Sequence, residues 1–284
     1  MATHRLLSDA FIEAHPTEAA AALETMPAAE TAAYLAQTSA RLAATVLERM
    51  VAVIAGQCLL SIPVEKAVAV LERLDVYSAA SILRTVEPAI RKPLLDAADD
   101  DVAVPLRLML TYPEGSAGAL MDPRVKVMPA DVTVREAIAR VRKSPGRILF
   151  YLYIVDRDGT LVGVLNLREL MLAPATQQVG VVARRGVARI APGASAATIV
   201  AHPRWRDVHA LPVADDSGRL LGAIRYGTFR RLEEEAALER RRRHPATLMI
   251  ALVQLYWLAF AALLPALTSI VVRVLESASE QERS

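Results

Sequence analysis

The side chains in this chain best suited to binding a metal ion are the carboxylates between residues 96 and 101. Asp96, Asp99, Asp100 and Asp101 lie within this one short stretch. Hard divalent cations prefer several carboxylate oxygens, so these acids could form a cation site together with acids from another domain. Carboxylates at the start of a helix also stabilise the helix dipole without any metal. Composition alone leaves both interpretations open.

Side chains suited to enzyme catalysis are scattered. Cys58 is the only cysteine and lies in an apolar run, which excludes an intramolecular disulfide and a cysteine-rich metal site. His4, His15, His202 and His209 have no nucleophile or metal ligand at a suitable spacing. The net charge is only +2, with basic residues mixed among acids. We therefore expect neither an enzyme nor a nucleic-acid-binding protein.

The spacing of apolar residues over the first ~110 positions predicts a series of short amphipathic helices. Pro16, Pro27 and Pro63 each open a helix-forming stretch, and proline is tolerated at a first helical position. The unit at residues 47–50 (Leu-Glu-Arg-Met) recurs at 71–74 (Leu-Glu-Arg-Leu). Such short helices cannot bury their apolar sides alone, so we expect them to stack as a superhelix.

A tandem repeat follows from about residue 120. Residues 154–165 recur without a gap as residues 213–224, with an aspartate and a glycine at matching positions. Each copy predicts a strand, a tight turn, a second strand and a helix, with Gly159 and Gly218 supplying the positive φ of the turn. A helical stretch precedes each copy. The pattern predicts two α/β units in tandem.

The excess of apolar residues is concentrated near the C-terminus. Apolar residues make up 54% of the chain, and residues 245–272 contain no charged side chain. A helix of that length spans ~42 Å, which exceeds the ~30 Å hydrocarbon core of a bilayer. The sequence therefore predicts a single transmembrane helix. Four arginines at residues 240–243 precede this segment and predict that the N-terminal domains lie in the cytoplasm. The predicted location is the cell inner membrane, which the chain would span once.

Three features together resemble the MgtE magnesium transporter family. Residues 112–121 (YPEGSAGALM) are similar to the linker of that family. A helical superhelix precedes them, and two repeats resembling CBS domains follow. Residues 151–170 are similar to the first CBS repeat of the family, and residues 210–222 to the second. The resemblance covers about residues 15 to 275.

The resemblance and the patterns together predict a multidomain chain with an all-α superhelical N-domain, an α/β tandem CBS pair and a single C-terminal transmembrane helix. The expected parts are an MgtE-type superhelical domain (1–119), CBS repeat 1 (120–176), CBS repeat 2 (177–232), a connecting helix with an arginine cluster (233–245), the transmembrane helix (246–273) and a polar tail (274–284).

The resemblance implies a dimeric Mg²⁺ sensor, in which ions bridge carboxylates of the superhelical domain, the CBS pair and the connecting helix. Gly227, Thr228 and Arg231 stand where the family has aspartates after the second repeat, so part of that ion clamp is missing. The acids that remain, and that form the predicted metal site, are Asp96, Asp99, Glu234 and Glu239.

The resemblance also implies a site for ATP or another adenine nucleotide in the CBS pair. The first repeat carries Asn166, Arg168 and Glu169 at the positions that commonly contact ribose and phosphate in CBS repeats. The second repeat carries Arg225 and Thr228 there and lacks the carboxylate. Nucleotide binding is therefore predicted at the first repeat.

The implied partners are a second copy of the chain, bound through the CBS domains, and the lipid bilayer. One helix per chain cannot enclose an ion path in hydrocarbon, so the pore is expected to come from a separately encoded subunit. The leading hypothesis is a membrane-anchored, Mg²⁺-related regulatory or sensor subunit. The alternative is a CBS-type adenine-nucleotide sensor unrelated to Mg²⁺.

Overall fold

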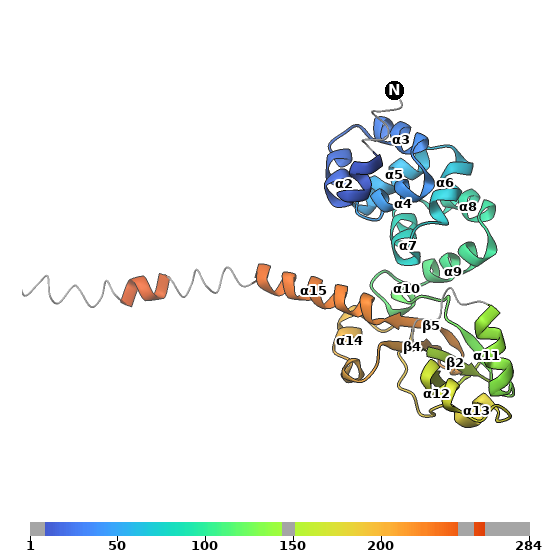
Figure 1. Cartoon of the computed structure of the whole chain (residues 1–284). Helices are drawn as coiled ribbons and strands as arrows, with labels where there is room; N and C mark the ends of the chain where they lie inside the picture. The colour runs from blue at the N-terminus through green and yellow to red at the C-terminus, as the bar shows by residue number, and fades with distance from the viewer. Residues whose placement is uncertain (1–8, 144–150, 244–252, 259–284) are drawn as a thin grey trace, which may run out of the picture. The chain divides into compact units, whose positions relative to one another are not determined.

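A computed structural model of the chain describes residues 9–143, 151–243 and 253–258 (Figure 1). The chain divides into two units, residues 1–229 and 230–284. Most of the predicted transmembrane segment 246–273, and all of the predicted tail 274–284, lie outside the described residues. Within the described ranges, none of the helices combines the length and the apolar character needed to cross a bilayer.

The N-terminal part of the first unit is helical throughout. Its helices are α2 (Pro16–Glu24), α3 (Ala28–Gln37), α4 (Ala40–Leu47), α5 (Ala52–Ser61), α6 (Val64–Leu71), α7 (Val76–Arg84), α8 (Pro88–Ala97), α9 (Asp100–Thr111) and the short α10 (Ala117–Leu120). From α2 to α9, each helix packs mainly on the helix two places along, so α3, α5, α7 and α9 form one row and α2, α4, α6 and α8 another. This stacking confirms the predicted helical superhelix (Figure 1).

A leucine at a constant spacing of twelve residues forms the centre of this stack. All of these leucines are fully buried: Leu35, Leu47, Leu59, Leu71 and Leu83. Because every helix and its turn together occupy about twelve residues, each helix contributes an equivalent side chain to one continuous core. Cys58 lies in the same core, and its burial raises the pKa of its thiol, in keeping with a structural role.

The prolines lie at the helix starts, with a shift of one residue at two of them. Pro16 is the first residue of α2, as predicted. Pro27 and Pro63 instead lie at the N-cap, one residue before the helix begins. All three prolines therefore begin a helix without removing a hydrogen bond from its interior.

The C-terminal part of the first unit contains two β-α units. The first has β1 (Val127–Pro129), α11 (Val134–Lys143), β2 (Tyr151–Val155), β3 (Leu161–Asn166), α12 (Leu167–Leu172) and α13 (Val179–Val182). The second has α14 (Ala196–Val200), a 3-10 helix η2 (Pro203–Arg206), β4 (Ala210–Ala214), β5 (Leu220–Arg225) and the start of α15 (Tyr226–Arg243). Strand β1 is parallel to β2, whereas β2–β3 and β4–β5 are antiparallel hairpins. Gly159 and Gly218 have φ of 81° and 83°, which confirms the predicted turns.

The segment at residues 112–121 joins the helical stack to the second β-α unit. The backbone N–H of Ala117 donates to the carbonyl of Ala194 over 2.8 Å. Gly118 packs against Tyr112 so closely that a Cβ there would lie 2.3 Å from the ring. Arg84 of α7 donates to the carbonyl oxygen of Tyr112 over 2.9 Å. The glycine and the tyrosine of this segment are therefore both needed for the close approach.

Candidate functional site

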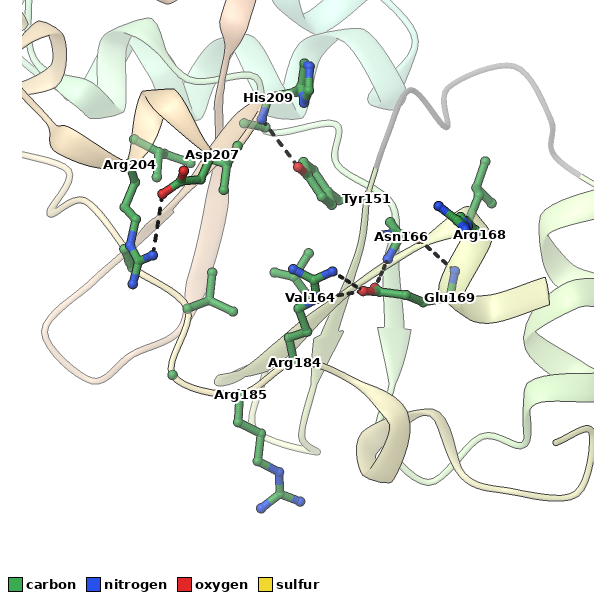
Figure 2. Close-up of a pocket in the computed structure, with 17 residues that line it drawn as sticks. Tyr151, Val164, Asn166, Arg168, Glu169, Arg184, Arg185, Arg204, Asp207 and His209 are labelled. Atoms are coloured by element: carbon green, nitrogen blue, oxygen red, sulfur yellow. Dashed lines mark hydrogen bonds and ion pairs between the residues drawn. The ribbon is translucent and has the colours of Figure 1, made fainter. Parts of the chain in front are cut away.

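A cavity of about 600 Å³ lies against the first β-α unit and continues to the start of β4. Figure 2 shows Asn166, Glu169 and Arg184 on one side of it and Arg204 with Asp207 on another. All three residues predicted to bind a nucleotide, Asn166, Arg168 and Glu169, line this cavity.

Asn166 and Glu169 hold each other at the start of α12. The backbone N–H of Glu169 donates to Oδ1 of Asn166 over 2.7 Å, and the backbone N–H of Asn166 donates to Oε2 of Glu169 over 3.0 Å. This reciprocal arrangement is a capping box, which satisfies two backbone donors at the helix N-terminus. The cap fixes where both side chains lie relative to the cavity.

The other carboxylate oxygen of Glu169 binds Arg184. Its Oε1 lies 2.6 Å from Nε and 2.5 Å from Nη2 of the arginine. Planar guanidinium groups suit such two-point contacts with a carboxylate. The Arg184 side chain is nevertheless 74% exposed, so a ligand in the cavity can reach it. Glu169 is thus occupied by the helix cap and by Arg184.

The remaining polar wall adds further cations. Arg204 lies 3.7 Å from the Asp207 carboxylate, and the phenol of Tyr151 accepts a hydrogen bond from the backbone of His209 over 3.3 Å. The residues that line the cavity include four arginines, at positions 168, 184, 185 and 204, and two carboxylates. With histidine neutral, the formal charge of the wall is therefore +2. A cationic wall of this kind favours an anionic ligand.

The rest of the cavity wall is apolar. Valine, leucine and alanine side chains supply it: Val164, Leu167, Val187, Ala188, Val208, Ala210 and Leu211. An apolar surface beside convergent guanidinium groups fits a ligand that joins a flat, weakly polar group to a charged one.

The predicted metal ligand Asp96 is already paired with two cationic side chains. Its Oδ2 lies 2.5 Å from Nζ of Lys92, and its Oδ1 lies 2.7 Å from Nη2 of Arg107. The hydrogen bond from Lys92, together with Arg107, lowers the pKa of the Asp96 carboxyl. A divalent ion at this carboxylate would have to displace both cations.

The other predicted metal ligands are also dispersed. Asp99 is the exposed N-cap of α9, and Asp100 and Asp101 occupy its first turn, where they complement the helix dipole. Glu234 lies 3.6 Å from Arg230 of its own helix. The side chain of Glu239 lies outside the described residues. Across residues 9–143, 151–243 and 253–258, the structure contains no group of three or more Asp, Glu, His or Cys side chains that could hold a metal.

Most of the cavity wall was not predicted from the sequence, since the three predicted residues are among seventeen that line it. Arg184 and Arg185 lie in the segment between the two repeats, and Arg204 and Asp207 lie in and just after η2. The available signal was the pair of arginines before Gly186, whose φ of 66° marks a turn in that segment. Nothing in the spacing connects that turn with Asn166.

Two known families match this chain, in the order of domains predicted from the sequence. Residues 14–115 match the MgtE intracellular N domain, and residues 117–176 match a CBS domain. The chain therefore contains an MgtE-type N domain followed by a CBS domain. The magnesium transporter MgtE of Thermus thermophilus is 28% identical over 152 residues, and that of Bacillus subtilis is 26% identical over 116 residues. The matched regions cover 53% and 40% of this chain, but only 34% and 26% of the two transporters.

Two solved structures share the fold of this chain. The cytosolic domain of the Mg²⁺ channel MgtE, crystallised in complex with ATP, has a TM-score of 0.54 and 24% identity. That likeness covers 77% of this chain and 95% of that one. The soluble part of a magnesium transporter has a TM-score of 0.59 at 18% identity and covers 84% of this chain and 99% of that one. At these identities the likeness establishes the fold: an all-helical domain followed by an α/β CBS pair.

Proposed function

We propose that this chain is a regulatory module of an MgtE-type magnesium transport system and that the first half of its CBS pair binds an adenine nucleotide. The observation that carries the nucleotide assignment is the cavity of about 600 Å³ with guanidinium groups on one wall and apolar side chains on another. Pockets for small molecules commonly have about this size.

The wall offers the two kinds of contact that a nucleotide needs. Arg184 and Arg204 are exposed to the cavity and can pair with phosphate oxygens, for which guanidinium groups are well suited. Val164 and Leu211 provide apolar surface for a base. The ATP bound to the cytosolic domain of an MgtE channel of the same fold supports this choice of ligand.

The second candidate is a module that senses Mg²⁺ directly. The acids at residues 96–101 favour it, because hard cations prefer carboxylate oxygens. The ion pairs of Asp96 with Lys92 and Arg107 weigh against it, since they neutralise that carboxylate. We therefore rank the nucleotide site above the Mg²⁺ site for the described part of the chain.

Two titrations of the full chain in detergent micelles separate the candidates. We expect millimolar ATP without Mg²⁺ to protect the chain from limited proteolysis, because a ligand that binds the folded state stabilises it. Protection by Mg²⁺ alone, lost in the variant Asp96→Ala with Asp99→Ala, would favour the second candidate. A chain that responds to neither ligand would contradict both.

We further propose that residues 246–273 span the membrane once, with the N-terminal domains in the cytoplasm. The uncharged run from 245 to 272 and the arginines before it support this topology. Carbonate extraction should leave the chain in the membrane pellet. Protease added to intact spheroplasts should spare an N-terminal epitope and remove it only after the membrane is permeabilised.

We also propose a homodimer formed through the CBS pair. Met171 and Leu172 of α12 and Val181 of α13 are 62%, 76% and 61% exposed. Apolar side chains gathered on neighbouring helices commonly mark an interaction surface. Helices α12 and α13 contact each other within one chain, so these exposed residues lie on neighbouring helices.

A further inference from the structure

The two β-α units repeat the same backbone arrangement, so each position in the first has a counterpart in the second. In the first hairpin Tyr151 pairs with Asn166, and in the second Ala210 pairs with Arg225. Asn166 lines the cavity at the end of β3, and Arg225 ends β5. Arg225 therefore stands where the first unit has Asn166.

A segment from outside each hairpin crosses it at the same point. Val164 and Arg184 exchange backbone hydrogen bonds of 3.1 and 3.0 Å, and Ala223 and Asp122 exchange bonds of 3.0 and 2.9 Å. A glycine precedes each strand residue, and a Cβ on it would lie 2.6 Å from the carbonyl oxygen of Arg184 or 2.7 Å from that of Asp122. Asp122 is thus the counterpart of Arg184.

The charges at these matching positions are reversed. In the first unit the arginine comes from the crossing segment and the carboxylate, Glu169, from α12. In the second unit the crossing segment supplies the carboxylate of Asp122, whose Oδ2 lies 2.6 Å from Nη2 of Arg225. Thr228 replaces the carboxylate on the helix.

Asp122 is held as a bound anion would be. In addition to the contact of Oδ2 with Arg225, Oδ1 accepts hydrogen bonds from the Arg124 side chain over 3.2 Å and from the Arg124 backbone N–H over 2.9 Å. The Asp122 side chain is only 8% exposed, whereas those of Arg124 and Arg225 are 21% and 38% exposed. Two partly accessible guanidinium groups therefore converge on one buried carboxylate.

We propose that the second unit contains a latent site for a phosphate-type anion, which the chain fills with its own Asp122. Carboxylate and phosphate oxygens make the same charge-assisted contacts with guanidinium groups. While Asp122 occupies Arg124 and Arg225, an external anion gains little there. The wild-type chain then has at most one phosphate-type site in its CBS pair, the cavity beside Arg184.

The test removes the Asp122 carboxylate and vacates the space that it fills. The variant Asp122→Ala leaves Arg124 and Arg225 without their carboxylate, so its melting temperature should fall. Inorganic pyrophosphate should raise that melting temperature more than it raises the wild type's. Equilibrium binding of pyrophosphate to the full chain in detergent should show one additional equivalent per chain. Asp131→Ala, at an exposed carboxylate 3.8 Å from Arg157, is the matched control and should bind as the wild type does.

The increase in the number of bound pyrophosphate molecules tests the second site independently of the proposed nucleotide site. If the cavity beside Arg184 binds pyrophosphate, the count rises from one to two; if it does not, the count rises from zero to one. A folded Asp122→Ala variant that binds no more than the wild type overturns the inference. If the variant folds only in pyrophosphate, it must unfold when the anion is dialysed away. A variant that pyrophosphate cannot rescue also overturns the inference.

Discussion

Glu169 has contacts within the chain that the resemblance does not imply. The resemblance implies a contact with ribose or phosphate, and the structure shows its two oxygens bound to the α12 cap and to Arg184. A carboxylate already bound to an arginine of the site lowers the positive charge that a phosphate meets. Glu169 therefore positions Arg184 and moderates its charge.

Glu169→Gln should raise the affinity for ATP about fivefold, which corresponds to roughly 1 kcal/mol for an ion pair whose arginine is exposed and whose carboxylate is half-buried. Glutamine keeps the capping box, because its amide oxygen can accept from the Asn166 backbone. Calorimetric titration of the full chain measures the change. A loss of affinity of tenfold or more would instead indicate that the carboxylate contacts the ligand.

The Asp96 carboxyl should stabilise the fold only at a pH where it is ionised. The Lys92 hydrogen bond and the Arg107 contact lower its pKa in the folded state, so the ionised carboxylate favours folding. That contribution is complete above the unfolded pKa of about 4 and is lost as the pH falls through the lower folded value. Urea midpoints of the wild type and of Asp96→Asn should differ at pH 7 and converge toward pH 3. A difference that grows as the pH falls would contradict this account.

Among the helices, the apolar pattern predicted the stack but not its period. The repeat of residues 47–50 at 71–74 includes two of the buried leucines, Leu47 and Leu71. Their intermediate, Leu59, lies in the nearly uniform apolar stretch of α5, where the buried side cannot be told from the exposed side by periodicity. Only packing on both neighbouring helices selects it.

Leu59→Ala should lower the free energy of unfolding by about 2–5 kcal/mol, because it opens a cavity at the centre of the stack. Leu60 is the matched control, since it is adjacent in α5 but 38% exposed. Leu60→Ala should cost less than about 1 kcal/mol. Denaturant unfolding of the two variants gives the comparison. Equal losses would mean that the twelve-residue core is not what stabilises this domain.

The strands and turns were predicted more completely than the cavity. The ungapped repeat marked both hairpins and the positive φ of Gly159 and Gly218. The cavity combines Asn166 with Arg184 and Arg204, which lie 18 and 38 positions further along the chain. Such pairing depends on how the two β-α units pack, which neither periodicity nor local spacing encodes.

For the assembled protein, the exposed apolar residues of α12 and α13 predict the association state. Leu172→Glu should convert the dimer to a monomer, because a charge in an apolar interface loses its hydration. Light scattering on the full chain in detergent, with the micelle mass subtracted, measures this. Leu238→Glu, at a leucine of α15 that is 59% exposed, is the control and should leave the mass unchanged. A Leu172→Glu chain of dimer mass would place the interface elsewhere.

The proposed membrane segment and the proposed nucleotide site make different demands on the sequence. The membrane proposal for the run from 245 to 272 rests on hydropathy alone, since a bilayer imposes only length and absence of charge. The ligand of the CBS pair depends on a few side chains at defined positions, so it must be measured directly.

The most direct measurement is the equilibrium binding of ATP to the full chain and to its Arg184→Ala variant. We predict that one ATP binds in the cavity beside Arg184 and that the variant loses about tenfold in affinity. A tenfold loss corresponds to about 1.4 kcal/mol, which is near the lower end of what a hydrogen bond to a charged group contributes. Arg157→Ala, at an exposed arginine outside the cavity wall, should bind ATP as the wild type does. A wild-type chain that binds no ATP at millimolar concentration, or an Arg184→Ala chain that binds it equally well, would contradict the assignment of this cavity as the nucleotide site.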